Sequence, residues 1–153
     1  MKLKKLIDVY PYKLTPEKKP LFLILKRAEG KIYEGQWRMI GGKVENSETR
    51  WEAAVREFKE ETNLAPELFW TVPTINHFYE AGSDLVHIIP AFGAQISKNA
   101  EPVLDGEHSR FKWIEAEQSE LYIYWPEQIR IIHLINKILL KGKILKEWTI
   151  PPK

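Results

Sequence analysis

The segment that decides the fold is GGKVENSETRWEAAVREFKEETNL, from Gly41 to Leu64. Thr49 followed three residues later by Glu52 forms a capping box, in which each side chain bonds a free backbone N–H group of the other residue at a helix start. Asn63 marks the other end, because asparagine tolerates the left-handed conformation that a helix C-cap often adopts. The sequence therefore predicts a helix that begins after Thr49 and ends before Asn63.

This predicted helix has two distinct faces. At 100° per residue, one arc carries the apolar residues and an adjacent arc carries three carboxylates. The apolar arc holds Trp51, Ala54, Val55 and Phe58, and the acidic arc holds Glu57, Glu60 and Glu61. Like charges at helical spacing repel one another, and the negative end of the helix dipole adds to that repulsion. A bound cation is the simplest compensation.

The chemistry of the donors indicates which cation. The three clustered side chains are carboxylates and the chain has no cysteine, so this face offers oxygen ligands. Oxygen donors favour a hard divalent ion, and Mg²⁺ fits best because it takes a few carboxylates and keeps water and phosphate oxygens as its other ligands, with Mn²⁺ as a substitute. The alternative is a solvated face whose glutamates pair with Arg50, Arg56 and Lys59. The three glutamates alone do not decide between these readings.

Length and composition predict one ordinary domain over residues 1–153. The chain is 44% hydrophobic and 12% aromatic, which is enough for a substantial core. Its net charge is only +2 and its basic residues are scattered, so neither nucleic acid nor membrane is an expected partner. The absence of cysteine excludes disulfides, zinc thiolate sites and a cysteine nucleophile. We expect a cytoplasmic protein with no leader and no membrane span.

Strand patterns occur on both sides of the acidic segment. Leu21–Arg27 is a continuous apolar run suited to a buried strand, followed by a loop with two glycines. Leu85–Ile96 predicts a strand interrupted near Pro90, with a hairpin turn before it, and FKWIEA predicts a shorter strand. An amphipathic helix begins at Pro126 and stops at Gly142. These elements indicate an α/β fold with a mixed sheet between helices.

The spacing within the acidic segment resembles a known signature. Gly42 is followed by five residues, then Glu48, then seven residues, then REFKEETNL from Arg56 to Leu64. This pattern resembles the Nudix box, the strand–loop–helix signature of the Nudix hydrolases. One departure is Asn63, where that family usually has glycine. The resemblance implies an α/β/α sandwich that hydrolyses a nucleoside diphosphate linked to another group, with water attacking phosphorus and magnesium bound.

The resemblance also implies residue roles. Glu57, Glu60 and Glu61 would hold metal, with the Gly42 carbonyl as a further oxygen ligand. Arg56 and Glu48 would pair and hold the loop against the helix. A metal is consistent with the chemistry, because pyrophosphate is highly charged and the attacking water needs a lowered pKa.

Residues outside the box add candidates. Glu107 is an acidic residue before a strand, as in Nudix subfamilies that use such a residue as an extra metal ligand or general base; the alternative is an ordinary loop carboxylate. Arg27 and Lys43 are candidate phosphate-binding residues, with surface solubility and pairing to glutamates as the alternative. Aromatic residues able to stack on a ring are Phe78, Tyr79, Tyr124 and Trp125, although a chain of this composition buries many aromatics.

The expected reaction is Mg²⁺-dependent hydrolysis of a small triphosphate. The tail resembles the branch that acts on dihydroneopterin triphosphate or a deoxynucleoside triphosphate such as dATP. The alternatives are a diadenosine polyphosphate hydrolase and a nucleotide-sensing domain that does not cleave. Oxidised dGTP is a third possible substrate, but the sequence identifies no residue that reads its base. A monomer and a homodimer are equally compatible with the sequence.

Overall fold

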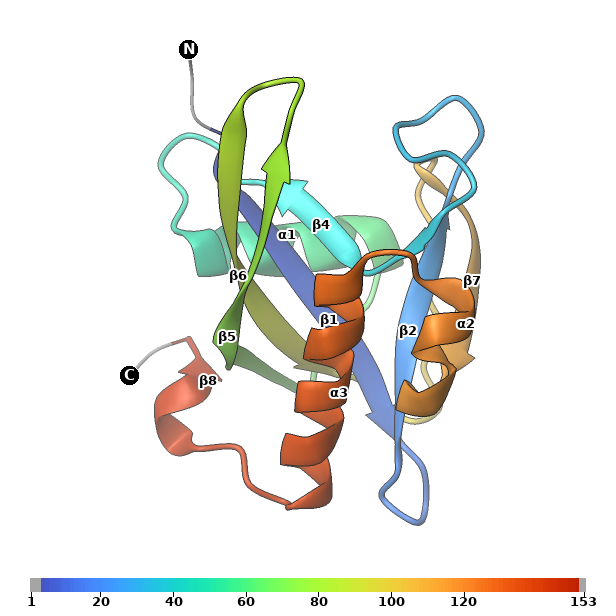
Figure 1. Cartoon of the computed structure of the whole chain (residues 1–153). Helices are drawn as coiled ribbons and strands as arrows, with labels where there is room; N and C mark the ends of the chain where they lie inside the picture. Colours follow the sequence, from blue (N-terminus) through green and yellow to red (C-terminus); the bar gives the residue numbers. More distant parts are fainter. Residues whose placement is uncertain (1–3, 152–153) are drawn as a thin grey trace.

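The computed structural model describes residues 4–151, which form an α/β/α sandwich (Figure 1). Within that range a mixed eight-stranded sheet lies between helices. The strands are β1 (Leu6–Leu14), β2 (Pro20–Arg27), β3 (Trp37–Arg38), β4 (Ile40–Lys43), β5 (Leu68–Glu80), β6 (Leu85–Gln95), β7 (His108–Ile114) and β8 (Thr149–Ile150). The helices are α1 (Arg50–Thr62), α2 (Ser119–Tyr122) and α3 (Pro126–Leu140), with short 3-10 turns η1 (Ala116–Gln118) and η2 (Lys146–Trp148).

Strand β1 lies where the sheet divides. Its C-terminal part, from Tyr12 to Leu14, pairs antiparallel with β2. Its N-terminal part pairs antiparallel with β4 on that same side, so Asp8 lies opposite Gly41. On the other side β1 pairs parallel with β6, which makes the sheet mixed. The sheet therefore splits between β4 and β2, and the candidate site lies at this division.

The pleat of β1 sends alternate side chains to the two faces of the sheet. Ile7 and Val9 are buried in the apolar cluster that contains residues of α1. Tyr10 and Tyr12 are buried in the cluster that contains residues of α3. The two cores on opposite faces confirm the predicted sandwich with a mixed sheet.

Helix α1 begins and ends where the sequence predicts. The Glu52 amide donates to Thr49 Oγ1 at 3.2 Å, and the Thr49 amide donates to Glu52 Oε1 at 2.9 Å. Asn63 is the C-cap in the left-handed conformation, with φ of 58°. The buried face differs slightly from the prediction, because Ala53 is fully buried as well.

The sheet differs from expectation in several features, and β1 was not among the predicted strands. Strand β6 runs through Pro90 without a break, so the predicted interruption is wrong; the irregularity lies in the pairing between Thr71 and Ile75 of β5. Strand β7 begins earlier than expected, at His108. Strand β8 was not predicted, because two residues carry no periodic signal. Among residues 4–151, no helix is long and apolar enough to cross a membrane.

Candidate active site

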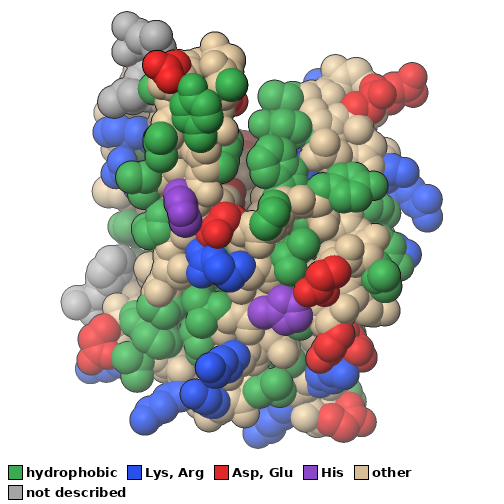
Figure 2. Space-filling model, in the orientation of Figure 1, with side chains coloured by type: hydrophobic (Ala, Val, Ile, Leu, Met, Phe, Trp, Pro, Cys, Tyr) green, Lys and Arg blue, Asp and Glu red, His purple; other side chains and the backbone are tan. Residues whose placement is uncertain are grey.

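A pocket with a volume of about 620 Å³ opens at the division of the sheet. That volume lies in the range of sites for small molecules. Figure 2 shows the surface hollowed between the β5–β6 hairpin and the loop that follows β2. The lining comes from both layers of the sandwich. One end carries acidic and basic side chains from α1 and the neighbouring strands, and the other carries aromatic and amide side chains.

Gly42 and Glu57 are in close contact at the acidic end. A Cβ atom built on Gly42 would lie 2.4 Å from the Glu57 Cγ and Cδ atoms. Glycine is therefore required at position 42 for space, because a side chain at this position would displace the Glu57 carboxylate. Burial raises the pKa of Glu57 above its usual value, although the neighbouring Arg56 opposes that shift.

Arg56 connects the acidic helix to the loop before it. Its guanidinium donates two hydrogen bonds to the Glu48 carboxylate, at 2.7 and 2.9 Å, and a third to the Lys43 carbonyl at 2.9 Å. It also donates to Glu57 Oε1 at 2.9 Å. The bond with Glu48 is the main cause that raises the pKa of Arg56, and the same bond lowers the pKa of Glu48. The contact predicted between Arg56 and Glu48 is present.

Glu61 is the most unusual carboxyl group of the site. Its side chain is 2% exposed, and no residue among 4–151 makes a hydrogen bond to Oε2. Burial, reinforced by the negative charges of Glu57, Asp105 and Glu107, raises the pKa of Glu61 to about 10. A buried carboxyl group with an unpartnered oxygen, facing other carboxylates, is compensated most directly by a cation.

Asp105 and His108 extend the acidic end from the loop before β7. Ligand atoms of Glu61, Asp105 and His108 all lie within 4.8 Å of one another. The His108 ring contacts Asp105 through Nδ1 at 3.0 Å and Glu61 through Nε2 at 3.5 Å, and burial lowers its pKa. Sequence analysis did not single out Asp105, because an aspartate in a loop carries no signal until the fold brings it to α1.

Of the other predicted residues near the acidic end, three line the pocket and one does not. Glu107 lines the pocket, has a side chain that is 52% exposed, and lies 3.6 Å from Arg27 Nη1 through its Oε2 atom. Arg27 and Lys43 line the pocket too. Glu60 does not: its side chain is 57% exposed and contacts Arg56 at 3.3 Å. Helix α1 thus turns Glu57 and Glu61 into the pocket and keeps Glu60 at its outer side.

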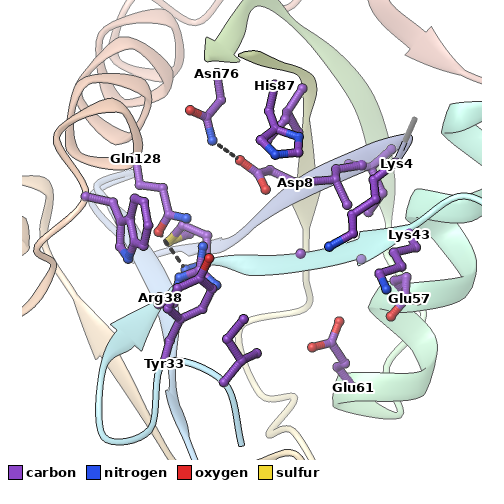
Figure 3. A pocket seen from close by; sticks show the side chains of 18 of the residues that line it. Lys4, Asp8, Tyr33, Arg38, Lys43, Glu57, Glu61, Asn76, His87 and Gln128 are labelled. Atoms are coloured by element: carbon purple, nitrogen blue, oxygen red, sulfur yellow. Dashed lines mark hydrogen bonds between the residues drawn. The ribbon is translucent and has the colours of Figure 1, made fainter. Parts of the chain in front are cut away.

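The other end of the pocket was largely missed by sequence analysis. Figure 3 shows Asp8, Asn76, Gln128 and Arg38 facing the cavity on the side away from Glu57 and Glu61. They come from four separate elements, so no local motif contains them. Aromatic residues Tyr33, Phe78 and Trp125 line the same region.

Of the ring-binding candidates, the structure brings two to the pocket. Phe78 lines it and packs against Trp125, with ring centroids 5.6 Å apart. Tyr79 follows Phe78 on β5 and therefore points to the other face of the strand. It is 59% exposed, lies outside the pocket lining, and donates to Asp84 at 2.8 Å. Tyr124 is also exposed and outside the lining.

The acidic end fits a hard divalent cation. Two observations support this fit: the unpartnered Oε2 of buried Glu61, and the close approach of the Gly42 backbone to the Glu57 carboxylate. The donors are carboxylate and carbonyl oxygens, with one histidine at the edge of the group. Such donors suit Mg²⁺ or Mn²⁺.

The fold and the site together define a class of protein: an α/β/α sandwich in which a strand–loop–helix segment turns glutamate side chains into a pocket. The chain belongs to the NUDIX domain family, whose profile matches residues 7–135, and it is a hydrolase of that family. The resemblance inferred from the box is thereby confirmed.

Individual relatives are more distant. The nucleoside triphosphatase NudI of Klebsiella pneumoniae (strain 342) is 27% identical over 109 residues, which cover 66% of this chain and 77% of that protein. Among solved structures, a Caenorhabditis elegans Ap4A hydrolase in a binary complex superposes with a TM-score of 0.76 at 22% identity, covering 92% of this chain and 100% of that one. The NUDIX domain of Shewanella oneidensis NrtR, complexed with ADP ribose, gives a TM-score of 0.73 at 15% identity, covering 91% and 90%.

Proposed function

We propose that this chain is a Mg²⁺-dependent pyrophosphohydrolase that cleaves a small nucleotide-like triphosphate, with Mn²⁺ as a possible substitute. The carrying observation is the acidic end of the pocket, where buried Glu61 has an unpartnered oxygen beside Glu57 and Gly42. Such an arrangement suits a cation that also binds phosphate. The ring-lined opposite end of the same cavity supports a substrate with a heterocycle at one end and phosphates at the other.

The side chains of the chain have separate tasks in this proposal. Glu57, Glu61 and the Gly42 carbonyl would hold the metal from inside the pocket, and Glu60 would be a further ligand. When bound, the cation offsets phosphate charge and lowers the pKa of the attacking water. Arg56 keeps Glu57 in position through the bonds described above.

The remaining groups act on the phosphates and on the water. Arg27 and Lys43 bind phosphate oxygens at the entrance of the acidic end, supported by their place in the pocket lining. Glu107 completes the site or takes the proton from water as phosphorus is attacked. Its half-exposed carboxylate, beside Arg27 in the pocket lining, supports this role.

The substrate class rests on the relatives as well as on the pocket. The similarity to proteins named nucleoside triphosphatase NudI supports a nucleoside triphosphate, such as the deoxynucleoside triphosphate expected from the tail of the sequence. Dihydroneopterin triphosphate, the other substrate expected from the tail, carries its triphosphate on a pterin and rests on that resemblance alone. A diadenosine polyphosphate is the alternative, since an Ap4A hydrolase shares the fold. A domain that binds nucleotides without cleaving them is the remaining alternative, and the complete set of box glutamates disfavours it.

A substrate panel tests the proposal. The purified chain is incubated with Mg²⁺ and with deoxynucleoside triphosphates, dihydroneopterin triphosphate or diadenosine tetraphosphate, and phosphate, pyrophosphate and nucleotide products are measured separately. We expect pyrophosphate and a monophosphate from triphosphates. Cleavage of the dinucleotide alone would select the alternative substrate, and tight nucleotide binding without any product would select the sensor.

A further inference from the structure

Asp8 is a buried carboxylate that neither the box nor the proposed mechanism uses. It is 5% exposed and lines the pocket at the end away from the acidic cluster (Figure 3). Asn76 Nδ2 donates to Asp8 Oδ2 at 2.6 Å. Among residues 4–151, no hydrogen bond is made to Oδ1 and no cation lies within ion-pair distance of the carboxylate. One oxygen of Asp8 is therefore fixed, and the other is available to the pocket.

This arrangement is unfavourable for packing alone. Asp8 is on the same face of β1 as Tyr10 and Tyr12, which are buried in an apolar cluster. A carboxylate on that face loses hydration and receives only one hydrogen bond in return. An ionised carboxylate accepts hydrogen bonds and donates none, so the site lacks donors. A ligand that brings donors would supply them.

The surroundings of Asp8 suit a flat ring. Trp125 and Phe78 form one aromatic wall, with centroids 5.6 Å apart. The Arg38 guanidinium lies over the rings of Tyr33 and Trp125, at 4.3 and 4.9 Å from their centroids, which limits its motion. A planar heterocycle stacks well on such side chains.

Other polar groups of this region are already fixed. Gln128 Oε1 accepts a hydrogen bond from the Met39 amide at 3.1 Å, which orients the Gln128 side chain at the wall of the pocket. Arg38 Nε is buried and has no hydrogen-bond partner among the described residues. A ring edge in this region would meet the acceptor oxygen Oδ1 of Asp8, whose other oxygen is held by Asn76, with the Arg38 cation to one side.

The two ends of the pocket are joined by one pair of strands. Asp8 lies opposite Gly41, and the next pair in the register joins Ile7 to Gly42, whose backbone meets Glu57. Because neighbouring residues of a strand face opposite sides of a sheet, Asp8 and the contact of Gly42 with Glu57 lie on opposite faces. A ligand that passes through the division of the sheet reaches both.

We propose, building on the triphosphate hydrolysis proposed above, that Asp8, held by Asn76, reads the ring of the substrate and selects a heterocycle with a ring N–H next to an exocyclic amino group. Guanine and pterin both present that pair of donors. Adenine and cytosine present an amino group next to a ring nitrogen that is itself an acceptor, and this lone pair repels an ionised carboxylate. Thymine presents one ring N–H between two carbonyl oxygens.

The test compares substrates in the wild type and in Asp8→Asn. For the wild type we expect a higher kcat/KM for dGTP and dihydroneopterin triphosphate than for dATP and dCTP. Asparagine has nearly the same shape but offers one acceptor and one donor, which match adenine. Asp8→Asn should therefore lower the dGTP-to-dATP ratio of kcat/KM by about 10- to 100-fold, the range for loss of hydrogen bonds to a charged group. Comparing dGTP with dihydroneopterin triphosphate then identifies which of the two rings is preferred.

A matched control and a binding measurement complete the design. Asp84→Asn changes an exposed aspartate that bonds Tyr79 outside the pocket, and it should leave the ratio unchanged. Binding of dGMP and dAMP, measured by calorimetry, reports ring selection without any hydrolysis. Absence of hydrolysis with tighter binding of dGMP than dAMP would refute the proposed reaction and support ring selection. Hydrolysis with equal rates for dGTP and dATP, or with a ratio that Asp8→Asn does not change, would overturn the role of Asp8 and leave the reaction intact.

Discussion

Arg56 holds Glu48 through two hydrogen bonds of 2.7 and 2.9 Å and contacts Glu57 with the same guanidinium at 2.9 Å. A flat guanidinium that binds a carboxylate at two points has little freedom to rotate. The loop before α1 and the carboxylate in the pocket are thus fixed relative to each other. Arg56 itself does not line the pocket.

The first prediction concerns this arginine. Arg56→Ala should lower hydrolysis by about 10- to 100-fold, the usual cost of removing a group that orients a metal ligand. The variant should also bind Mg²⁺ more weakly and need a higher Mg²⁺ concentration for half-maximal activity, because Glu57 is no longer oriented. Arg50→Ala, which removes an exposed arginine from the first turn of the same helix, is the control and should retain activity. Unchanged kinetics in Arg56→Ala would refute the positioning role.

The second prediction concerns Gly42. Gly42→Ala introduces a methyl group 2.4 Å from the Glu57 side-chain carbons, so the carboxylate must move. A displacement of about 1 Å in a reacting centre lowers the rate by about 100-fold. Gly82→Ala, in the hairpin turn where nothing lies within 4 Å of the added carbon, should be neutral. Steady-state kinetics of the two variants check the prediction, and a fully active Gly42→Ala would contradict it.

The box and the fold class were predictable because their signals are local. The capping box at Thr49 and the left-handed cap at Asn63 involve residues close in sequence, and both appear in the structure. The contact between Arg56 and Glu48 follows from one helix and one loop. Glu60 shows the limit of helical spacing: it shares the predicted acidic arc with Glu57 and Glu61, yet it is exposed and lies outside the pocket lining.

The residues at the pocket end away from Glu57 and Glu61 were not predictable, because they are far apart in the sequence and share no local signal. Asp8, Asn76 and Gln128 lie on β1, β5 and α3, and only the sheet order brings them together. In the sequence, Asp8 is the one acidic residue of a mainly apolar strand that also contains Lys13. Its position on the buried face next to Tyr10 is the one local sign, since a strand that is buried on both faces seldom contains a carboxylate.

The third prediction is metal dependence. EDTA should abolish hydrolysis and excess Mg²⁺ should restore it, because the unpartnered oxygen of Glu61 then regains its cation. The fold should persist in EDTA, since the two apolar clusters contain none of the residues proposed to bind metal. Circular dichroism checks the fold in the same samples. Full activity in EDTA would exclude the metal-dependent mechanism.

The fourth prediction separates two glutamates. If Glu107 takes the proton from water, Glu107→Gln should preserve nucleotide binding and reduce turnover by about 10²- to 10⁴-fold. Glu60→Gln should instead shift the Mg²⁺ dependence, because it removes an anionic oxygen from a cation that needs one. Titrating Mg²⁺ against rate distinguishes the two effects.

A control defines the outcome for Glu107. Glu29→Gln changes an exposed glutamate of the loop that follows β2 and should behave as wild type. Normal turnover in Glu107→Gln together with failure of Glu60→Gln would mean that Glu107 is an ordinary loop carboxylate. The base would then lie in the box, with Glu57 as the first candidate because it faces the pocket.

The last prediction concerns stability and pH at Asp8. Burial raises the pKa of Asp8 from 3.8 to about 6, and the Asn76 hydrogen bond and the Arg38 charge only partly oppose it. A carboxyl group with a raised pKa in the folded state binds more protons than in the unfolded state between about pH 4 and 6. Its contribution to stability therefore falls as the pH rises through that window.

Asp8→Asn removes this titration and should stabilise the protein at neutral pH. A shift of about two pKa units corresponds to at most about 3 kcal/mol in the free energy of unfolding. We expect Asp8→Asn to unfold at higher denaturant concentration than wild type at pH 7.5, with a smaller difference at pH 4.5 where folded Asp8 is protonated. Asp84→Asn should show no such pH-dependent gain.

If Asp8 served packing alone, its substitution would destabilise the protein. A more stable Asp8→Asn protein that has lost its selectivity for guanine or pterin would identify Asp8 as a ligand-binding group. Equal stability of wild type and Asp8→Asn at both pH values would contradict the raised pKa.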